Sequence, residues 1–493
     1  MSPERETNPV GEEQSTLFSP DFNRSIQVEA REDRLTSDAG ALLLREVFSR
    51  LGLEELFAKS LVDPRRPELI THPQIELLRA HLLLLAQGWQ DQDDADFHRH
   101  DPVMRLAVSE RRGTGPLEKP PEGTKRADGL ASQPTLSRLV KALSSEKQRS
   151  ALRTSLLTVA ARRVRAMRGH RLRHVTLDVD SLPIEVHGQQ EGSQYNGHYG
   201  VRCYHPLVAV LGETGDLVDV RLREGNVHTA EGALEFILPL LDRLEGELCQ
   251  VASVRIDAGF PEDKLLSALE ARKVGYVARI RKNERLKNLA APFLQPLAPS
   301  SDTEPSLAFH ELSYQASSWS TARRIVLVLQ QEPGELFPHF FFLLTNWPAE
   351  QTTAVALLDL YRQRGQAESH FGELMSVLEP ALSSTRRKKS HYRGQEPKRR
   401  AAAQEPFAAN EVKLLLNALA YNLAHAARCL LEKVTGQGWS LSRFSERVLR
   451  VAARVLVHAR RVVVVIACRS AVYWRQLWAA LGQLCWLAPP RPA

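Results

Sequence analysis

The chain has 493 residues, a formal net charge of +7 and a pI near 9.2. This length exceeds that of one ordinary domain and predicts two or three structural units. The basic charge suits a polyanionic partner, but many ordinary proteins are equally basic, so charge by itself supports nucleic-acid binding only weakly.

The composition argues against membrane, secreted and zinc-binding proteins. Apolar runs such as residues 462–467 fall far short of the roughly 20 residues that a membrane-spanning helix needs. The first residues are charged and polar and lack the apolar core of a signal peptide. The five cysteines are odd in number and lack CxxC spacing, which disfavours a disulfide framework and a zinc site. We therefore expect a cytoplasmic protein with no membrane partner.

The first 165 residues divide into an arm and a helical region. Residues 1–20 are polar and rich in Glu, Ser and Pro, which predicts a disordered arm. Over residues 21–165, apolar residues recur at helical spacing, as in GALLLREVFSRLGLEELF, with a Gly- and Pro-rich loop at 111–129. We interpret this helical N-terminal region as DNA-binding, although it contains no convincing helix-turn-helix pattern.

The periodicity changes from helical to strand-like at His174. Five predicted strands cover residues 174–182, 203–212, 217–226, 251–260 and 274–282. Helical segments separate the third strand from the fourth and the fourth from the fifth. Three consecutive strands followed by helix, strand, helix and strand predict an α/β fold with a ribonuclease H-like sheet of mixed direction, whose first part covers residues 170–289.

Three further regions follow this sheet. Residues 290–348 contain strand-like segments separated by Pro, Gly and Ser, which predicts a β-rich insertion. Residues 349–385 return to helical spacing and are expected to complete the α/β core. A basic segment then leads into a helical C-terminal region, so that residues 386–493 form the last unit.

Two aspartates stand at the ends of predicted strands. Asp180 in LDVDSL and Asp257 in VRIDAGF each end an apolar, β-branched run. Asp178 lies two residues before Asp180, so the two side chains leave the same face of the strand. We favour Asp180 as the functional acid because sites in open α/β sheets form at the carboxyl ends of strands. The alternatives are an acid pair facing solvent on an edge strand and, for Asp257, a turn-forming role before glycine.

A third acid lies on a predicted helix. Tyr361, Arg364 and Glu368 fall at i, i+3 and i+7 and therefore share one stripe of that helix. The arginine and tyrosine are suited to holding DNA phosphate, while an ordinary ion pair between Arg364 and Glu368 is the alternative. Two strand-end aspartates and one helical glutamate together predict a site for Mg²⁺, with Mn²⁺ able to substitute, whose usual chemistry is phosphoryl transfer.

Two polar segments accompany these acids. The segment VHGQQEGSQYNGHYG, residues 186–200, predicts a loop that contacts DNA or flanks the metal site, with a zinc site or a functionless hairpin as alternatives. The basic run RRKKSHYRGQEPKRR, residues 386–400, suits phosphate neutralisation, although such runs are usually solvated surface. We predict DNA contacts by the first four residues of this run, Arg386, Arg387, Lys388 and Lys389.

Several motifs carry a resemblance to a known family. Asp-Ser at 180–181, Asp-Ala-Gly-Phe at 257–260 and Tyr-x2-Arg-x3-Glu at 361–368 resemble, in order and spacing, the DDE transposases of bacterial insertion sequences. The β-rich insertion ahead of the third acid is also similar to that family. The segments LTSDAGALLLREV, VHGQQEGSQYNGHYG and FAANEVKLLLNALAYNLA extend the resemblance, to one subgroup, over most of the chain.

The resemblance implies a transposase that binds the terminal inverted repeats of its insertion sequence, cleaves them by metal-dependent phosphodiester hydrolysis and joins the 3′-hydroxyl ends to target DNA. By position, it implies that Asp180, Asp257 and Glu368 are the catalytic, metal-binding triad and that Tyr361 and Arg364 hold the DNA backbone. It also implies a homodimer in the DNA complex and a bacterial cytoplasmic location, at the nucleoid when the protein is bound to DNA.

Two positions depart from the family pattern. The family places a lysine seven residues after the glutamate, where this chain has Met375, and a threonine two residues after the first aspartate, where it has Leu182. Lys388 or Lys389 could supply the missing phosphate contact. Two alternatives stay open: a metal-dependent nuclease without strand transfer and, because of these departures, a catalytically inactive DNA-binding descendant.

Overall fold

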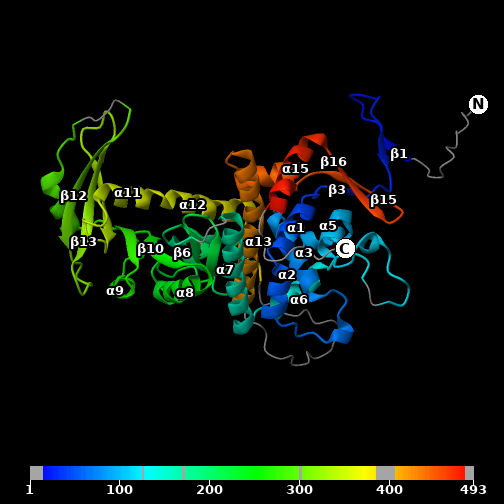
Figure 1. The fold of residues 1–493 in the computed structure, drawn as a ribbon, viewed down its shortest axis with the longest axis horizontal. Helices are drawn as coiled ribbons and strands as arrows, with labels where there is room; N and C mark the ends of the chain where they lie inside the picture. The colour runs from blue at the N-terminus through cyan, green and yellow to red at the C-terminus, as the bar shows by residue number, and fades with distance from the viewer. Residues whose placement is uncertain (1–14, 125–126, 169–171, 299–302, 385–405, 484–493) are drawn as a thin grey trace, which may run out of the picture.

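The computed structural model of the chain describes residues 15–124, 127–168, 172–298, 303–384 and 406–483. Within these ranges the molecule is elongated, with a large mixed sheet toward one end and a helical body at the other (Figure 1). The long helices α7 (Glu146–Arg168) and α13 (Pro406–Thr435) stand between them.

The sheet has eight strands in the order β12-β13-β14-β11-β10-β4-β8-β9. Its core strands are β4 (His174–Ser181), β8 (Leu207–Leu211), β9 (Leu217–Arg221), β10 (Gln250–Ile256) and β11 (Gly275–Ile280). The strands β4, β10 and β11 run parallel, while β8 and β9 pair antiparallel beside β4. Numbered along the chain, these five strands stand in the order 3-2-1-4-5, which confirms the predicted ribonuclease H-like fold.

The region predicted as a β-rich insertion extends this sheet. Its strands are β12 (Ser306–Tyr314), β13 (Arg323–Gln331) and β14 (His339–Thr345). Since β14 pairs antiparallel with β11, the insertion continues the core sheet. The middle strand β13 buries alternate apolar side chains against two different cores, as expected for a strand that is covered on both faces.

Helices cover both faces of the sheet. On one face, α8 (Ala233–Glu247) and α9 (Asp263–Ala271) share a buried apolar cluster with residues of β4, β8 and β10. On the other face, α11 (Ala354–Arg362) packs against β11 and β13, and α13 packs against β9. Because Gln363 keeps helical backbone angles, α11 continues into α12 (Arg364–Glu373), which runs from the sheet to the helical body (Figure 1).

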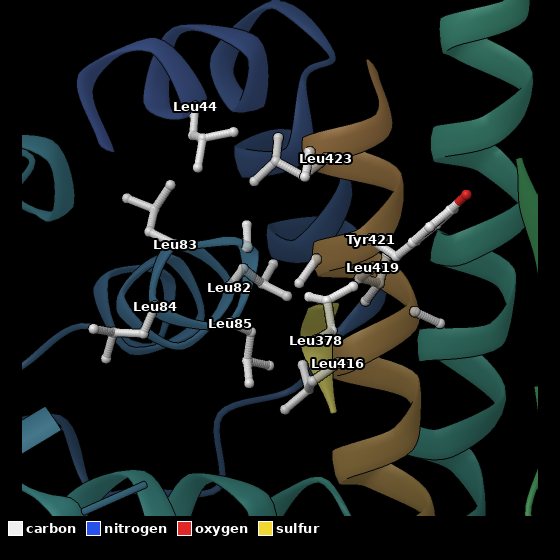
Figure 2. Packing of buried hydrophobic residues seen from close by; sticks show 14 of the residues in the cluster. Leu44, Leu82, Leu83, Leu84, Leu85, Leu378, Leu416, Leu419, Tyr421 and Leu423 are labelled. Carbon is white, nitrogen blue, oxygen red and sulfur yellow. The ribbon is translucent and has the colours of Figure 1, made fainter. Parts of the chain in front are cut away.

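Helix α13 is the centre of the helical body. It packs against α7 and against α3 (Gln74–Ala86), and Figure 2 shows Leu82 and Leu85 of α3 near Leu416 and Leu419 of α13. By length and composition α13 could span a membrane, but 94% of its apolar window is buried inside the protein, so it serves as a core helix. The N-terminal and C-terminal helical regions therefore share one apolar core.

The shorter helices pack around this centre or beside the sheet. Those of the body are α1 (Ala41–Arg50), α2 (Leu53–Ser60), α4 (Asp94–Phe97), α5 (Pro102–Val108), α6 (Gln133–Ala142), α14 (Leu441–Phe444) and α15 (Cys468–Gln483). Beside the sheet lies α10 (Glu284–Ala290).

The arm predicted to be disordered is described only in its last residues. Residues 1–14 lie outside the described part of the chain, whereas β1 (Ser15–Phe18) pairs antiparallel with β2 (Val28–Ala30). The prediction of disorder is therefore wrong for residues 15–18. The local sequence STLF ends in two apolar residues, and such a segment favours extended pairing over a solvated arm.

The sequence predicts a helical C-terminal region, and this prediction is wrong for residues 453–466. The region contains an antiparallel hairpin of β15 (Ala453–His458) and β16 (Arg461–Ile466), and β15 also pairs with β3 (Leu35–Thr36). The turn places Ala459 at a φ of 52°. Four consecutive valines explain the difference, because β-branched side chains fit a pleated strand better than a helix.

Candidate active site

Asp180 and Asp257 lie at the carboxyl ends of neighbouring parallel strands. Asp178 of β4 stands in register with Arg255 of β10. Asp180 and Asp257 follow these residues by two positions each, so they lie at the same edge of the sheet, where open α/β sheets form their sites. Both side chains are partly buried.

Arg364 connects the first and third predicted acids. Its Nη2 donates to Asp180 Oδ2 at 2.5 Å, and its Nη1 donates to Glu368 Oε1, one helical turn further on. Tyr361 lies half-buried near the end of α11, where burial raises the pKa of its hydroxyl and the charge of Arg364 opposes that effect. The pair between Arg364 and Glu368 is thus more than a local helical contact, since the same guanidinium also reaches β4.

Negative charge is concentrated at this edge. The pKa of Asp180 is raised to about 6, chiefly by burial, with Asp257 and Glu368 adding to the effect and Arg364 opposing it. The side chain of Asp180 is 14% exposed and that of Glu368 is 57% exposed. Three carboxylates around one guanidinium carry a net negative charge, which attracts a cation.

The donor set fits a hard divalent cation. Carboxylate oxygens are the ligands that Mg²⁺ and Mn²⁺ prefer. The charges of Asp257 and Glu368 contribute to the raised pKa of Asp180, and a bound cation would relieve this repulsion. Asp180, Asp257 and Glu368 all offer carboxylate oxygens of this kind at the same edge of the sheet.

A second group of ligand-type side chains lies in the helical body. Among the described residues, ligand atoms of Asp38, His98 and Asp101 all lie within 4.8 Å of one another. Trp89 Nε1 donates to Asp38 at 2.9 Å, and such hydrogen bonds account for the group as a polar network. Within the same described ranges, neither the three acids at the sheet edge nor the zinc alternative of residues 186–200 forms a group this close.

Asp178 has a partner of its own. It is buried and accepts two hydrogen bonds from Arg255, from Nε at 2.6 Å and from Nη2 at 2.5 Å. Burial raises the pKa of Asp178, and the Arg255 hydrogen bonds and charge oppose that rise. Sequence reasoning missed Arg255, although its position two residues before Asp257 matches the position of Asp178 before Asp180.

The segment at residues 186–200 lies beside the acids. It belongs to a small sheet of β5 (Ile184–Glu185), β7 (Val201–Tyr204) and β6 (Gln194–Asn196). Tyr199, in the turn between β6 and β7, packs its ring against His198 and His205 at centroid distances of 4.8 and 5.6 Å. Burial raises the pKa of Tyr199, and the charges of Asp180 and Asp257 add to this. Sequence reasoning had not singled out Tyr199 or His205.

The two departures from the family pattern lie against the apolar core. Met375 falls in a π-helical turn, Leu374–Leu378, which follows α12, and both Met375 and Leu182 are partly buried against the core of the helical body. Neither side chain offers a donor for phosphate. The four basic residues predicted to contact DNA, Arg386, Arg387, Lys388 and Lys389, lie outside the described residues.

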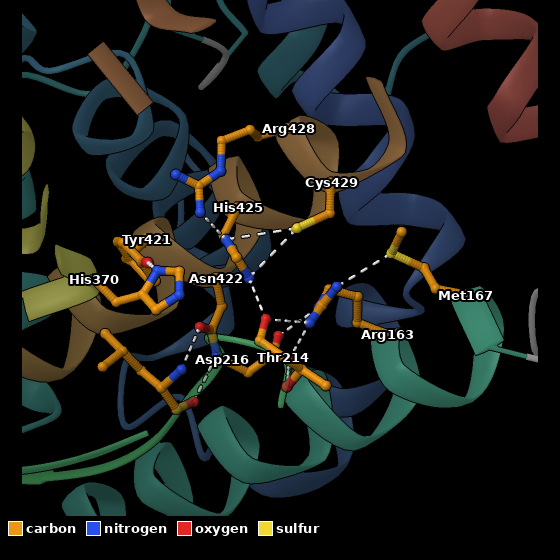
Figure 3. Close-up of polar contacts among 11 residues, drawn as sticks. Arg163, Met167, Thr214, Asp216, His370, Tyr421, Asn422, His425, Arg428 and Cys429 are labelled. Carbon is orange, nitrogen blue, oxygen red and sulfur yellow. Dashed lines mark hydrogen bonds and ion pairs between the residues drawn. The ribbon is translucent and has the colours of Figure 1, made fainter. Parts of the chain in front are cut away.

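A polar cluster anchors α12 on the side opposite Glu368. His370 Nδ1 lies 2.9 Å from the Tyr421 hydroxyl (Figure 3). Arg428 Nη1 donates to Glu373 Oε2 at 2.5 Å. Tyr421 and Arg428 both belong to the buried helix α13. We call these residues the rear cluster. It consists of His370, Glu373, Tyr421 and Arg428 together with their neighbours Arg163, Thr214, Asp216 and His425.

Comparisons with known proteins identify the family. None of the curated proteins compared with this chain matches it. A solved structure of a piggyBac transposase synaptic complex with hairpin DNA is 12% identical, and the match covers 92% of this chain and 82% of that chain with a TM-score of 0.38. The family model described as "Transposase DDE domain group 1" matches residues 18–488, which is nearly the whole sequence, and the chain therefore belongs to this family of DDE transposases.

Proposed function

We propose that this protein binds the terminal inverted repeats of its own insertion sequence, cleaves them by metal-dependent phosphodiester hydrolysis and joins the 3′-hydroxyl ends to target DNA. One observation carries the proposal. Asp180 and Glu368 meet at Arg364, beside Asp257, at the carboxyl edge of the core sheet. The family match over residues 18–488 supports the same chemistry.

The three carboxylates would hold Mg²⁺, with Mn²⁺ as a substitute. When bound, two such ions supply the charge that activates an attacking oxygen and stabilises a leaving oxygen. Asp180 and Asp257 would hold the ions from the ends of strands, while Glu368 would do so from α12 and is the more exposed of the two acids that Arg364 contacts. No covalent intermediate with the protein is needed, so Tyr361 acts as a DNA contact.

Arg364 and Tyr361 are the proposed contacts to the DNA backbone near the cleaved end. The planar guanidinium of Arg364 matches the oxygens of a phosphate as well as those of a carboxylate, so it can serve both Asp180 and DNA. Tyr361 lies on the same helical path and adds a hydroxyl donor. Arg386, Arg387, Lys388 and Lys389 follow this path in the sequence and are proposed to neutralise further phosphates.

The proposed working form is a homodimer that bridges two DNA ends. The proposed location is the bacterial cytoplasm, at the nucleoid when DNA is bound. An equilibrium sedimentation measurement with and without terminal-repeat DNA tests the first of these two proposals, since a dimer is expected in the complex.

Cleavage of a labelled terminal repeat in Mg²⁺ or Mn²⁺ tests the function directly. The wild type is expected to cut, and Asp180→Ala, Asp257→Ala and Glu368→Ala are expected to cut at least about a thousandfold more slowly. The matched control is Asp242→Ala. It removes an exposed acid of α8 that pairs with Arg272 at the end of α9, and this variant should cut at the wild-type rate. A triad variant that cuts at the wild-type rate removes that residue from the assignment.

The same assay separates the two alternatives. With target DNA present, a nuclease would give cut ends without a joined product, whereas the proposed transposase gives both. The inactive descendant, which the apolar setting of Met375 and Leu182 favours, would bind the terminal repeat with salt-dependent affinity and would not cut it in either metal.

A further inference from the structure

Arg255 is a fully buried arginine near the centre of the catalytic sheet. Its side chain is 1% exposed and is enclosed by protein. It donates from Nε to Asp178 Oδ1 at 2.6 Å and from Nη2 to Asp178 Oδ2 at 2.5 Å. This bidentate pair joins β10 to β4, the two strands that carry Asp257 and Asp180.

The third nitrogen of the same guanidinium reaches the helical path that carries Glu368. Arg255 Nη1 donates to the Leu360 carbonyl at 2.9 Å and to Gln363 Oε1 at 3.3 Å. Leu360 lies in the last turn of α11, and Gln363 is the residue between α11 and α12. One side chain of β10 therefore contacts both β4 and the residue directly before α12, the helix that bears Glu368.

The contacts lie close to the acids along each element. Asp178 and Arg255 precede Asp180 and Asp257 by two residues, which in a strand is about 7 Å. The space around the pair is also tightly filled, because a Cβ on Gly212 would lie 2.5 Å from Arg255 Nη2 and 2.9 Å from Asp178 Oδ2. A shift of this pair would be passed over a short, rigid backbone to the acids.

We propose that Arg255, fixed by Asp178, is a positioning residue that sets the spacing of Asp180, Asp257 and Glu368 and thereby the affinity of the site for its divalent cation. The inference rests on the proposed function. Mg²⁺ demands near-ideal octahedral geometry, so small errors in carboxylate spacing weaken its binding. Residues behind the ligands of metal sites typically contribute 10–100-fold to metal affinity.

Lysine is the informative replacement for Arg255. Arg255→Lys keeps the positive charge beside Asp178, but a single ammonium cannot make the bidentate pair and also reach α11 and Gln363. We expect the Mn²⁺ dissociation constant to rise about 10–100-fold. Binding of terminal-repeat DNA without metal should be unchanged, because the Arg255 side chain is only 1% exposed and is therefore not available to contact DNA.

The measurement is electron paramagnetic resonance of free Mn²⁺ titrated against the full chain. Binding that Asp180→Ala abolishes defines the site, so ions held elsewhere are excluded. The activity readout is the Mn²⁺ concentration that gives half-maximal cleavage. High Mn²⁺ should restore cleavage by Arg255→Lys, a rescue that a merely structural defect would not show.

Arg323→Lys is the matched control. Arg323 is likewise buried, at 3% exposure, and joins β13 to Asp263 and Glu270 of the α9 region, away from the acids. It should lose thermal stability without any change in Mn²⁺ affinity. Equal losses of Mn²⁺ affinity in both arginine variants would overturn the inference, as would normal Mn²⁺ affinity in folded Arg255→Lys.

Asp178→Asn is the second variant, for use if Arg255→Lys does not fold. It keeps the shape of the side chain and weakens the two hydrogen bonds that hold Arg255. We therefore expect a loss of Mn²⁺ affinity that is smaller than in Arg255→Lys. Unchanged Mn²⁺ affinity in this variant also counts against the proposal. If the wild type does not cleave the terminal repeat, the proposed function is refuted. If the wild type cleaves and Arg255→Lys binds Mn²⁺ with normal affinity, only the present inference is refuted.

Discussion

The carboxylates at the two ends of helix α12 have pKa values shifted in opposite directions. At the start of α12, Arg364 is shared between Asp180 and Glu368, and the pKa of Asp180 is raised to about 6 by burial and by its acidic neighbours. At its end, burial of Glu373 is outweighed by nearby His370 and by the charge and hydrogen bond of Arg428, which lower the pKa of Glu373.

The difference separates acids that hold the fold from acids that stand ready for a ligand. In the rear cluster each acid has its own arginine, since Arg163 pairs with Asp216 as Arg428 pairs with Glu373. At the sheet edge the acids outnumber the arginine that serves them. Clustered carboxylates with a raised pKa mark functional sites more often than structural ones.

Arg163→Met should lower the free energy of unfolding by about 3–5 kcal/mol, because it leaves the Asp216 carboxylate buried without its cation. Denaturant unfolding at pH 7 measures the loss. Arg272→Met, which breaks an exposed pair with Asp242, is the control and should cost less than about 1 kcal/mol. Similar losses in both variants would mean that the rear cluster is not a structural anchor.

Gly215→Ala should lower the free energy of unfolding by about 2–4 kcal/mol. Gly215 has a φ of 72°, where alanine costs about 1 kcal/mol, and its Cβ would lie 2.4 Å from His370 Nε2, which adds an overpacking cost of about 1–3 kcal/mol. Because His370 would have to leave Tyr421, cleavage should also slow.

The control for this change is Gly232→Ala. Gly232 has the same φ of 72°, but a Cβ there would meet nothing within 4 Å. Urea denaturation of both variants isolates the steric contribution of His370. If the two alanine variants lose equal stability, the contact between the β8–β9 turn and α12 has no energetic weight.

Asp180→Asn should raise the free energy of unfolding at pH 7 by at most about 3 kcal/mol, since each pKa unit is worth about 1.4 kcal/mol. The pKa of Asp180 rises from 3.8 to about 6 in the fold, so the folded state holds the proton more tightly. The contribution of Asp180 to the free energy of unfolding of the wild type therefore falls as the pH rises from about 4 to 6.

The pH dependence gives this prediction its test. The gain of Asp180→Asn should be full above pH 6 and absent below about pH 4, where Asp180 is neutral in both states. Unfolding of both proteins at pH 4 and pH 7 measures it. A variant less stable than the wild type at pH 7 would place Asp180 with the structural acids of the rear cluster.

Glu368→Gln should change stability by less than about 1 kcal/mol, because an ion pair with a side chain that is 57% exposed is worth little. Under the proposed function the same variant should lose cleavage. Thermal unfolding and the cleavage assay, run on one preparation, separate these two effects. A large loss of stability would show that Glu368 is needed for the fold.

Much of the architecture was predictable from local pattern. The core strands could be located because apolar, β-branched runs alternate with helical spacing between turn residues, and the acids Asp180 and Asp257 end two of those runs. The hairpin at residues 453–466 was missed because a short apolar run does not distinguish a strand from a buried helix by period alone. Arg255 was missed because a lone charged residue in a strand carries no local sign of its partner.

The sequence by itself determined the core strands and helices and their succession along the chain, which is that of a ribonuclease H-like sheet. It also determined the identity of three acids with an arginine and a tyrosine near the third. These features depend on local spacing. Only the tertiary structure decided that Arg255 pairs with Asp178, that Arg364 bridges Asp180 and Glu368, and that the N-terminal and C-terminal helices share one core. These contacts join residues far apart along the chain. Their partners are chosen by packing and by the cost of burying an unpaired charge, which no local pattern encodes.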